Sequence, residues 1–173
     1  MNLLEQFKKI TTFIFDVDGV LTDGTVLVLD GGLQARRMHI KDGFALQMAI
    51  KNGYKVLIVS GGDSPQVKNR LEKLGITDVH MSVLDKQTFV QEYMSTNNLK
   101  KEQVLFMGDD LPDLPVMSIV GLPVCPADAV AEIKAAVEYI SPINGGAACV
   151  REVIEKVLKL NDHWNYRVDV ASR

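Results

Sequence analysis

The chain has 173 residues, of which 47% are hydrophobic and 24% are charged, and its formal net charge is −3. This length and composition are typical of one soluble globular domain, which buries roughly 70% of the surface of its unfolded chain. The negative charge and the absence of any basic run longer than Arg36-Arg37 argue against nucleic-acid binding, and no stretch resembles a signal peptide or a membrane helix.

The first elements lead to two closely spaced aspartates. Residues 1–10 are predicted to form a short helix, and the aromatic and β-branched run that ends at Asp16 predicts a buried strand at Thr12–Asp16. Asp16 and Asp18 stand at the end of this run, and Gly19 follows at once. Open α/β sheets bind their ligands at this end of their strands, so the pair marks a candidate site.

The next elements predict a β-hairpin and a helix. Residues 25–29 alternate in polarity, Asp30-Gly31-Gly32 is a turn signal, and residues 34–39 can return as the second arm. A helix is then predicted to open at Asp42-Gly43 and to stop at Gly53, which is a typical position for the end of a helix.

The rest of the chain alternates strand and helix several times. Further strands are predicted at Lys55–Val59, Val79–Ser82, Gln103–Met107, Leu122–Cys125 and Tyr139–Ile140. Further helices are predicted from Ser64-Pro65 to about Leu74, from Asp85-Lys86 onward, at 130–137 and after Gly145-Gly146. This alternation predicts an α/β fold, a Rossmann-like parallel sheet flanked by helices in a single domain of residues 1–173, with a polar tail at 161–173.

Polar residues stand at the ends of several predicted strands. Asp16 and Asp18 follow the first strand, Ser60-Gly61 follows the second, and Asp109, Asp110 and Asp113 follow the fourth, while Lys86 opens a helix. Any one of them alone is more typical of a turn, a helix cap or a solvated surface. Because the carboxyl ends of parallel strands meet at one edge of a sheet, their joint occurrence predicts a catalytic site.

These residue types fit phosphoryl transfer. Clustered carboxylates repel one another, and Mg²⁺ relieves this repulsion because it prefers oxygen ligands. A carboxylate can attack phosphorus and form an aspartyl-phosphate, and a second one can protonate the leaving oxygen and then activate water. Ser60 and the Gly61 amide can donate hydrogen bonds to phosphoryl oxygens, and Lys86 adds a positive charge.

These motifs resemble those of the haloacid dehalogenase superfamily of aspartate-nucleophile phosphohydrolases. Asp16-x-Asp18, Ser60, Lys86 and Gly108-Asp109-Asp110-x-x-Asp113 match its four motifs in order and spacing. Lys41-Asp42-Gly43, Gly121-Leu-Pro-Val124 and Gly145-Gly146 are similar to the capless branch of 3-deoxy-D-manno-octulosonate 8-phosphate (KDO 8-phosphate) phosphatases. No gap in this chain is long enough for a cap domain.

The resemblance implies a role for each matching residue. Asp16 is expected to be the nucleophile and Asp18 the general acid and base, assisted by Ser60 and Lys86. Mg²⁺ is expected on Asp16, the Asp18 backbone carbonyl and Asp109, supported by Asp110 and Asp113. Substrate contacts are expected from His39, Ile40, Lys41, Asp42, Gly43, Gly61, Arg70 and Lys86.

Two departures from the branch pattern concern the sugar. Gly62 stands where the branch usually has an arginine, and Ala148 replaces a glycine of the tail signature. The expected substrate is KDO 8-phosphate, in lipopolysaccharide precursor synthesis, with a nine-carbon relative such as KDN 9-phosphate as the alternative. A second alternative is a non-enzymatic receiver-like module, although its phosphate acceptor would lie mid-chain rather than on the first strand.

The resemblance also implies an assembly. Members of this branch form homotetramers in which a hairpin or tail covers the active site of a neighbouring subunit. Here the hairpin at 25–39 and the tail beyond Gly145 are the two candidate covers. Cys125 and Cys149 fit neither a metal site nor a disulfide framework, so we expect two core thiols in a reducing cytoplasm.

Overall fold

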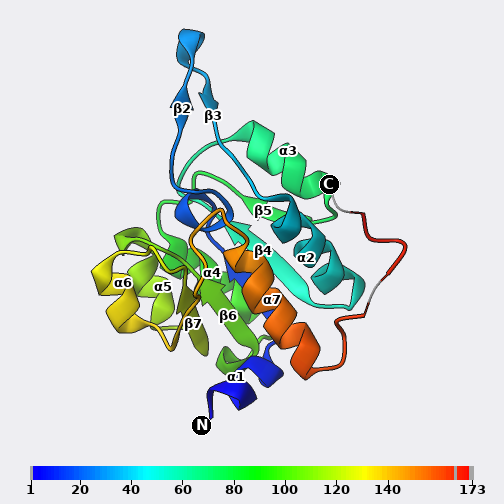
Figure 1. Cartoon of the computed structure of the whole chain (residues 1–173). Helices are drawn as coiled ribbons and strands as arrows, with labels where there is room; N and C mark the ends of the chain where they lie inside the picture. Colours follow the sequence, from blue (N-terminus) through cyan, green and yellow to red (C-terminus); the bar gives the residue numbers. More distant parts are fainter. Residues whose placement is uncertain (1, 166, 172–173) are drawn as a thin grey trace.

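A six-stranded parallel sheet forms the centre of the computed structural model, which describes residues 2–165 and 167–171 (Figure 1). The strand order is β5-β4-β1-β6-β7-β8, and all neighbouring pairs are parallel. The strands are β1 (Thr12–Phe15), β4 (Lys55–Val59), β5 (Asp78–His80), β6 (Val104–Met107), β7 (Leu122–Cys125) and β8 (Tyr139–Ile140). The predicted Rossmann-like sheet is therefore confirmed.

Helices connect these strands and cover both faces of the sheet. They are α1 (Leu3–Lys9), α2 (Ile40–Lys51), α3 (Pro65–Lys73), α4 (Lys86–Thr96), α5 (Leu114–Met117), α6 (Ala131–Ala136) and α7 (Cys149–Leu160). The Ser64 and Asp85 side chains accept hydrogen bonds from backbone N–H groups and cap α3 and α4. Helix α2 begins two residues before the predicted Asp42, because His39 Nδ1 accepts from Lys41 N at 3.1 Å and caps it earlier.

The alternation of side chains along β1 divides the core between the two faces. Phe13 and Phe15 belong to a cluster with buried residues of α1, α2, α3 and α7. Ile14 points to the opposite face, into a cluster with residues of α4, α5 and α6. Because β1 is buried on both faces, the aspartate that follows it stands on a rigid central strand.

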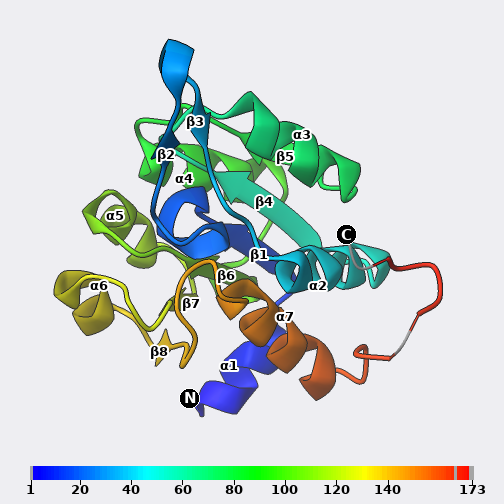
Figure 2. The same cartoon turned by 45° about the horizontal axis from the view of Figure 1, so that its top comes forward.

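The hairpin is shorter than predicted and stands clear of the sheet (Figure 2). Its paired arms are β2 (Leu27–Val28) and β3 (Gln34–Ala35), which are antiparallel. Leu27 is 63% exposed and Val28 is 69% exposed, so no core within the subunit supports a longer ladder. An antiparallel bridge between Thr22 and Met38 attaches the returning arm to the loop that follows β1.

The C-terminal segment runs back along α2 (Figures 1 and 2). Trp164 packs edge-on against Phe44, with ring centroids 6.0 Å apart. Gln47 Nε2 donates to the Ala171 carbonyl at 2.8 Å, and Val170 is buried. The predicted tail is thus packed on its own subunit, although residues 166, 172 and 173 lie outside the described residues. Within the described chain, no helix has the length and apolar character needed to cross a membrane.

Candidate active site

Three adjacent strands bring the predicted polar residues to one edge of the sheet. β1 lies between β4 and β6, so Asp16, Ser60 and Asp109 all follow neighbouring strand ends. The ladder continues past β1, because Asp16 N donates to the Met107 carbonyl at 3.1 Å. The strand order also reverses direction at β1, and open α/β sheets bind ligands at such a point.

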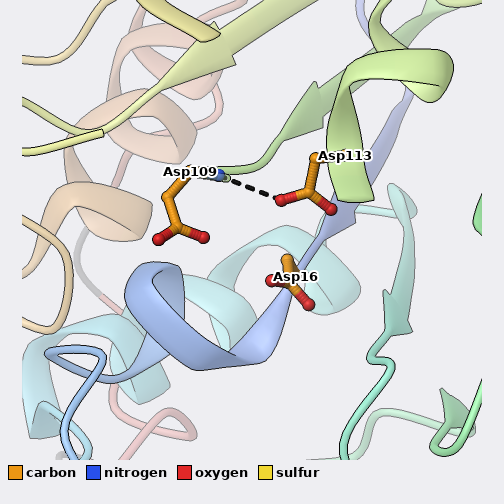
Figure 3. Close-up of side chains that lie close together, drawn as sticks. All are labelled: Asp16, Asp109 and Asp113. Atoms are coloured by element: carbon orange, nitrogen blue, oxygen red, sulfur yellow. Dashed lines mark hydrogen bonds between the residues drawn. The ribbon is translucent and has the colours of Figure 1, made fainter. Parts of the chain in front are cut away.

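Three carboxylates converge beside this edge. Asp16, Asp109 and Asp113 each offer an oxygen, and these oxygens all lie within 4.8 Å of one another (Figure 3). Asp113 is 1% exposed and its Oδ2 accepts from Asp109 N at 3.0 Å, which fixes the loop after β6. Gly19 is required here, because a Cβ at that position would overlap the Asp109 carboxylate.

Lys86 lies against the same carboxylates. Its side chain is 5% exposed, and its Nζ lies 2.8 Å from Asp16 Oδ1 and 2.7 Å from Asp113 Oδ1. Burial alone would lower the pKa of Lys86, but the two carboxylates outweigh this effect and raise it. The lysine therefore remains a fixed positive charge at the edge of the sheet.

One lysine does not neutralise this cluster. Burial raises the pKa of Asp16, the negative charge of Asp113 raises it further, and Lys86 opposes both. Burial and the charges of Asp16, Asp113 and Asp110 raise the pKa of Asp109 to about 7. Carboxylates forced together in this way fit a divalent cation with a preference for oxygen ligands, such as Mg²⁺.

The Asp18 carboxylate is not one of these three, and it pairs with an arginine. Its Oδ1 accepts from Arg36 Nε at 2.6 Å. Arg36 was not among the residues predicted from the sequence, because nothing in the spacing along the chain connects the hairpin arm with Asp18. The only available signal was the missing arginine at position 62.

A cavity of about 430 Å³ opens above these groups. Its wall includes the expected Gly61, and the buried Ser60 accepts from the Gly62 N–H at 3.2 Å through its Oγ. Asp110 lines it too, but its carboxylate accepts from Leu111 N and caps the next turn. The cavity is lined by Asp16, Asp18, Gly24, Ser60, Gly61, Gly62, Val83, Leu84, Lys86, Asp109, Asp110, Pro112 and Asp113.

Most of the predicted substrate-binding residues do not line this cavity within one subunit. Only Gly61 and Lys86 do. Ile40 and Arg70 line a neighbouring groove of about 580 Å³ between the hairpin and α3. Lys41 lines a third groove, beside α7. Five of the eight predicted residues therefore divide among three surfaces.

Three members of that set have structural roles at the start of α2. His39 caps the helix, as described above, and Gly43 is buried in its first turn. Asp42 is 2% exposed, and its Oδ1 accepts from Arg151 N at 2.7 Å. Its carboxylate thus faces the first turn of α7, which lacks a capping side chain of its own, so within the subunit it does not face the cavity.

Comparison with known proteins identifies relatives of this chain. The model of the haloacid dehalogenase-like hydrolases matches residues 75–154. The 3-deoxy-D-manno-octulosonate 8-phosphate phosphatase of Yersinia pestis is 33% identical over 161 residues, which cover 93% of this chain and 86% of that protein. The phosphatase of the same name from Haemophilus influenzae is 32% identical over 155 residues, covering 90% and 86%.

Solved structures of such phosphatases have the same fold. The Yersinia pestis structure matches with a TM-score of 0.90, covering 93% of this chain and 87% of that one. The Moraxella catarrhalis structure, 30% identical, matches with a TM-score of 0.88 and covers 92% of each chain. It is a complex with magnesium, phosphate and KDO.

Proposed function

The chain belongs to the haloacid dehalogenase-like hydrolases, in the family of the 3-deoxy-D-manno-octulosonate 8-phosphate phosphatases, and we propose that it hydrolyses KDO 8-phosphate. It is a phosphoric monoester hydrolase. The observation that carries the proposal is the convergence of Asp16, Asp109, Asp113 and Lys86 at the end of the central strand, in a cavity also lined by Asp18 and Ser60.

The chemistry assigned to these residues has two halves. In the first, an Asp16 oxygen attacks phosphorus, the bond from phosphorus to the ester oxygen breaks, and that oxygen takes a proton from Asp18. In the second, Asp18 removes a proton from water, which attacks the aspartyl-phosphate and releases phosphate and Asp16. The Lys86 ammonium, 2.8 Å from Asp16 Oδ1, offsets the negative charge on the transferred group.

The metal is Mg²⁺, which offsets the charge of the carboxylates and of the phosphoryl oxygens when it is bound. We assign Asp16, Asp109 and the Asp18 backbone carbonyl as its ligands. Asp113 supports them, because it holds both Lys86 and the Asp109 backbone in place. Asp110 lies at the rim of the same cavity.

A homotetramer is part of this proposal. The hairpin exposes five large apolar side chains, those of Val26, Leu27, Val28, Leu29 and Leu33. An exposed apolar patch of this kind is typical of a protein–protein interface. A neighbouring subunit placed on them can bring residues such as Arg70 and Lys41 toward an active site. Sedimentation velocity tests the assembly, and a monomer at every concentration would contradict it.

We also place the protein in the cytoplasm. Among the described residues, Cys125 and Cys149 are buried free thiols. Reduced thiols of this kind are typical of a reducing compartment.

A phosphate-release assay tests the function. The substrates are KDO 8-phosphate, KDN 9-phosphate and p-nitrophenyl phosphate, each with Mg²⁺ and with EDTA. We expect the highest kcat/KM for KDO 8-phosphate and no release in EDTA. A preference for KDN 9-phosphate would move the substrate to the nine-carbon acids, and no Mg²⁺-dependent release from any ester would overturn the proposal.

A further inference from the structure

Arg36 is a nearly buried cation on an otherwise exposed hairpin. Its side chain is 8% exposed, although it directly follows the exposed strand β3. Its Nε lies 2.6 Å from Asp18 Oδ1, and its Nη2 lies 3.4 Å from Asp18 Oδ2. The hairpin thus sends one guanidinium group inward, onto a residue of the catalytic cavity.

The next residue shows that this placement is specific. Arg37 is 85% exposed and pairs with Asp23 at 2.7 Å on the surface. The two arginines are neighbours between β3 and the bridge formed by Met38, yet of the two Arg36 alone forms an ion pair with a residue of the cavity. Arg37 therefore offers a matched control with the same charge and nearly the same position.

Gly62 leaves room for this pair. A Cβ at position 62 would lie 3.0 Å from Asp18 Oδ2 and 3.5 Å from Arg36 Nη2. Gly62 does not have a positive φ, so its backbone conformation does not require glycine. The absent side chain instead keeps space beside Asp18 Oδ2, the oxygen to which Arg36 makes only the longer contact.

We propose that Arg36 is a positioning residue for Asp18, an assignment that rests on the proposed function. The short contact to Oδ1 and the longer one to Oδ2 together fix the plane of the carboxyl group, because the guanidinium fork is rigid. Oδ2 is then the oxygen placed to pass a proton to the ester oxygen as the bond to phosphorus breaks. Gly62 keeps the approach to Oδ2 open for the leaving group.

Two small esters separate this role from substrate binding. Phenyl phosphate and p-nitrophenyl phosphate have the same charge and similar shape, but phenolate is the stronger base and needs the proton more. The kcat/KM value reports the step in which Asp16 is phosphorylated, before the intermediate is hydrolysed. A positioning defect at Asp18 therefore lowers this value for phenyl phosphate more than for p-nitrophenyl phosphate.

Arg36→Ala should lower kcat/KM about 100-fold for phenyl phosphate, within the range of general acid catalysis, and less than about fivefold for p-nitrophenyl phosphate. Arg36→Lys should recover part of the loss, since it keeps the charge without the fork. Gly62→Ala should show the same preference without removing a charge. Arg37→Ala should stay within about twofold of the parent on both esters.

The assignment would be overturned if Arg36→Ala lowered kcat/KM equally for the two esters. It would also be overturned if Arg37→Ala lowered kcat/KM for phenyl phosphate as much as Arg36→Ala does. Thermal unfolding of each variant shows whether it is folded, and Gly62→Ala and Arg36→Lys decide the question if Arg36→Ala is not. A parent enzyme inactive on both esters and on KDO 8-phosphate would overturn the proposed function, and the assignment with it.

Discussion

Asp42 is a buried carboxylate with one satisfied and one unsatisfied oxygen. Oδ1 accepts from Arg151 N at 2.7 Å, whereas Oδ2 is buried without a hydrogen-bond partner among the described residues. Burial raises the pKa of Asp42 to about 7, and the contact with Arg151 opposes this only in part. The side chain therefore stabilises the start of α7 at the cost of an ionisable group in the interior.

This arrangement predicts a pH-dependent stability. An unfolded aspartate has a pKa of about 3.9, so between this value and about 7 the folded state binds more protons than the unfolded state. The stability that protonated Asp42 contributes is therefore fully present below about pH 4. It is lost progressively as the pH rises through the folded pKa of about 7. From pH 5 to pH 8 the parent should lose about 2–3 kcal/mol more than Asp42→Asn, which keeps an acceptor but cannot ionise.

Urea unfolding of both proteins at these two pH values measures the difference. Comparison with the variant is necessary because Asp16 and Asp109 also have raised pKa values and shift the stability of both proteins alike. Parallel pH profiles for parent and variant would show that Asp42 does not titrate in this range.

At the scale of elements, the start of α7 contains a strained residue. Ala148 precedes the helix with φ +84° and ψ +28°, a left-handed conformation that costs a residue with a Cβ about 1–2 kcal/mol. The resemblance implied a glycine at this position, and the structure shows why glycine fits there. In this chain the strained residue, Ala148, lies where α7 meets α2.

Ala148→Gly should therefore stabilise the protein by about 0.5–1 kcal/mol, since glycine relieves the strain but loses more backbone entropy on folding. The control is Ala147→Gly, one residue earlier, which does not have a positive φ and should be neutral or slightly destabilising. Denaturant midpoints measure both changes. A destabilised Ala148→Gly would mean that the methyl group contributes more by packing than the backbone loses by strain.

Elements with local signals were predictable from the sequence. β4 has the predicted bounds, α3 begins after the predicted cap Ser64, and α4 begins at the predicted Asp85-Lys86, because these signals lie within a few residues of the element. α5 was not predicted, since four residues are too few for a helical period. The hairpin arms were predicted too long, because apolar alternation does not reveal whether a core lies beneath them.

At the scale of the whole molecule, the parallel order of the strands explains why the site was predictable. Asp16, Ser60 and Asp109 meet because they follow β1, β4 and β6, which are neighbours in the sheet. Arg36 and Asp42 were not predictable in their observed roles, because each contact depends on the path of a segment through space. Arg36 lies 18 residues from Asp18, and Asp42 lies 109 residues from Arg151.

The central claim is that Asp16 carries the phosphoryl group during turnover, and trapping that intermediate tests it most directly. The enzyme is mixed with Mg²⁺ and KDO 8-phosphate, quenched during turnover and treated with borohydride, which reduces an aspartyl-phosphate to homoserine. Peptide mass spectrometry then locates the modified residue. We predict homoserine at position 16 in the parent and none in Asp16→Asn, which should also lose essentially all turnover; modification at another residue, or an active Asp16→Asn, would contradict the account.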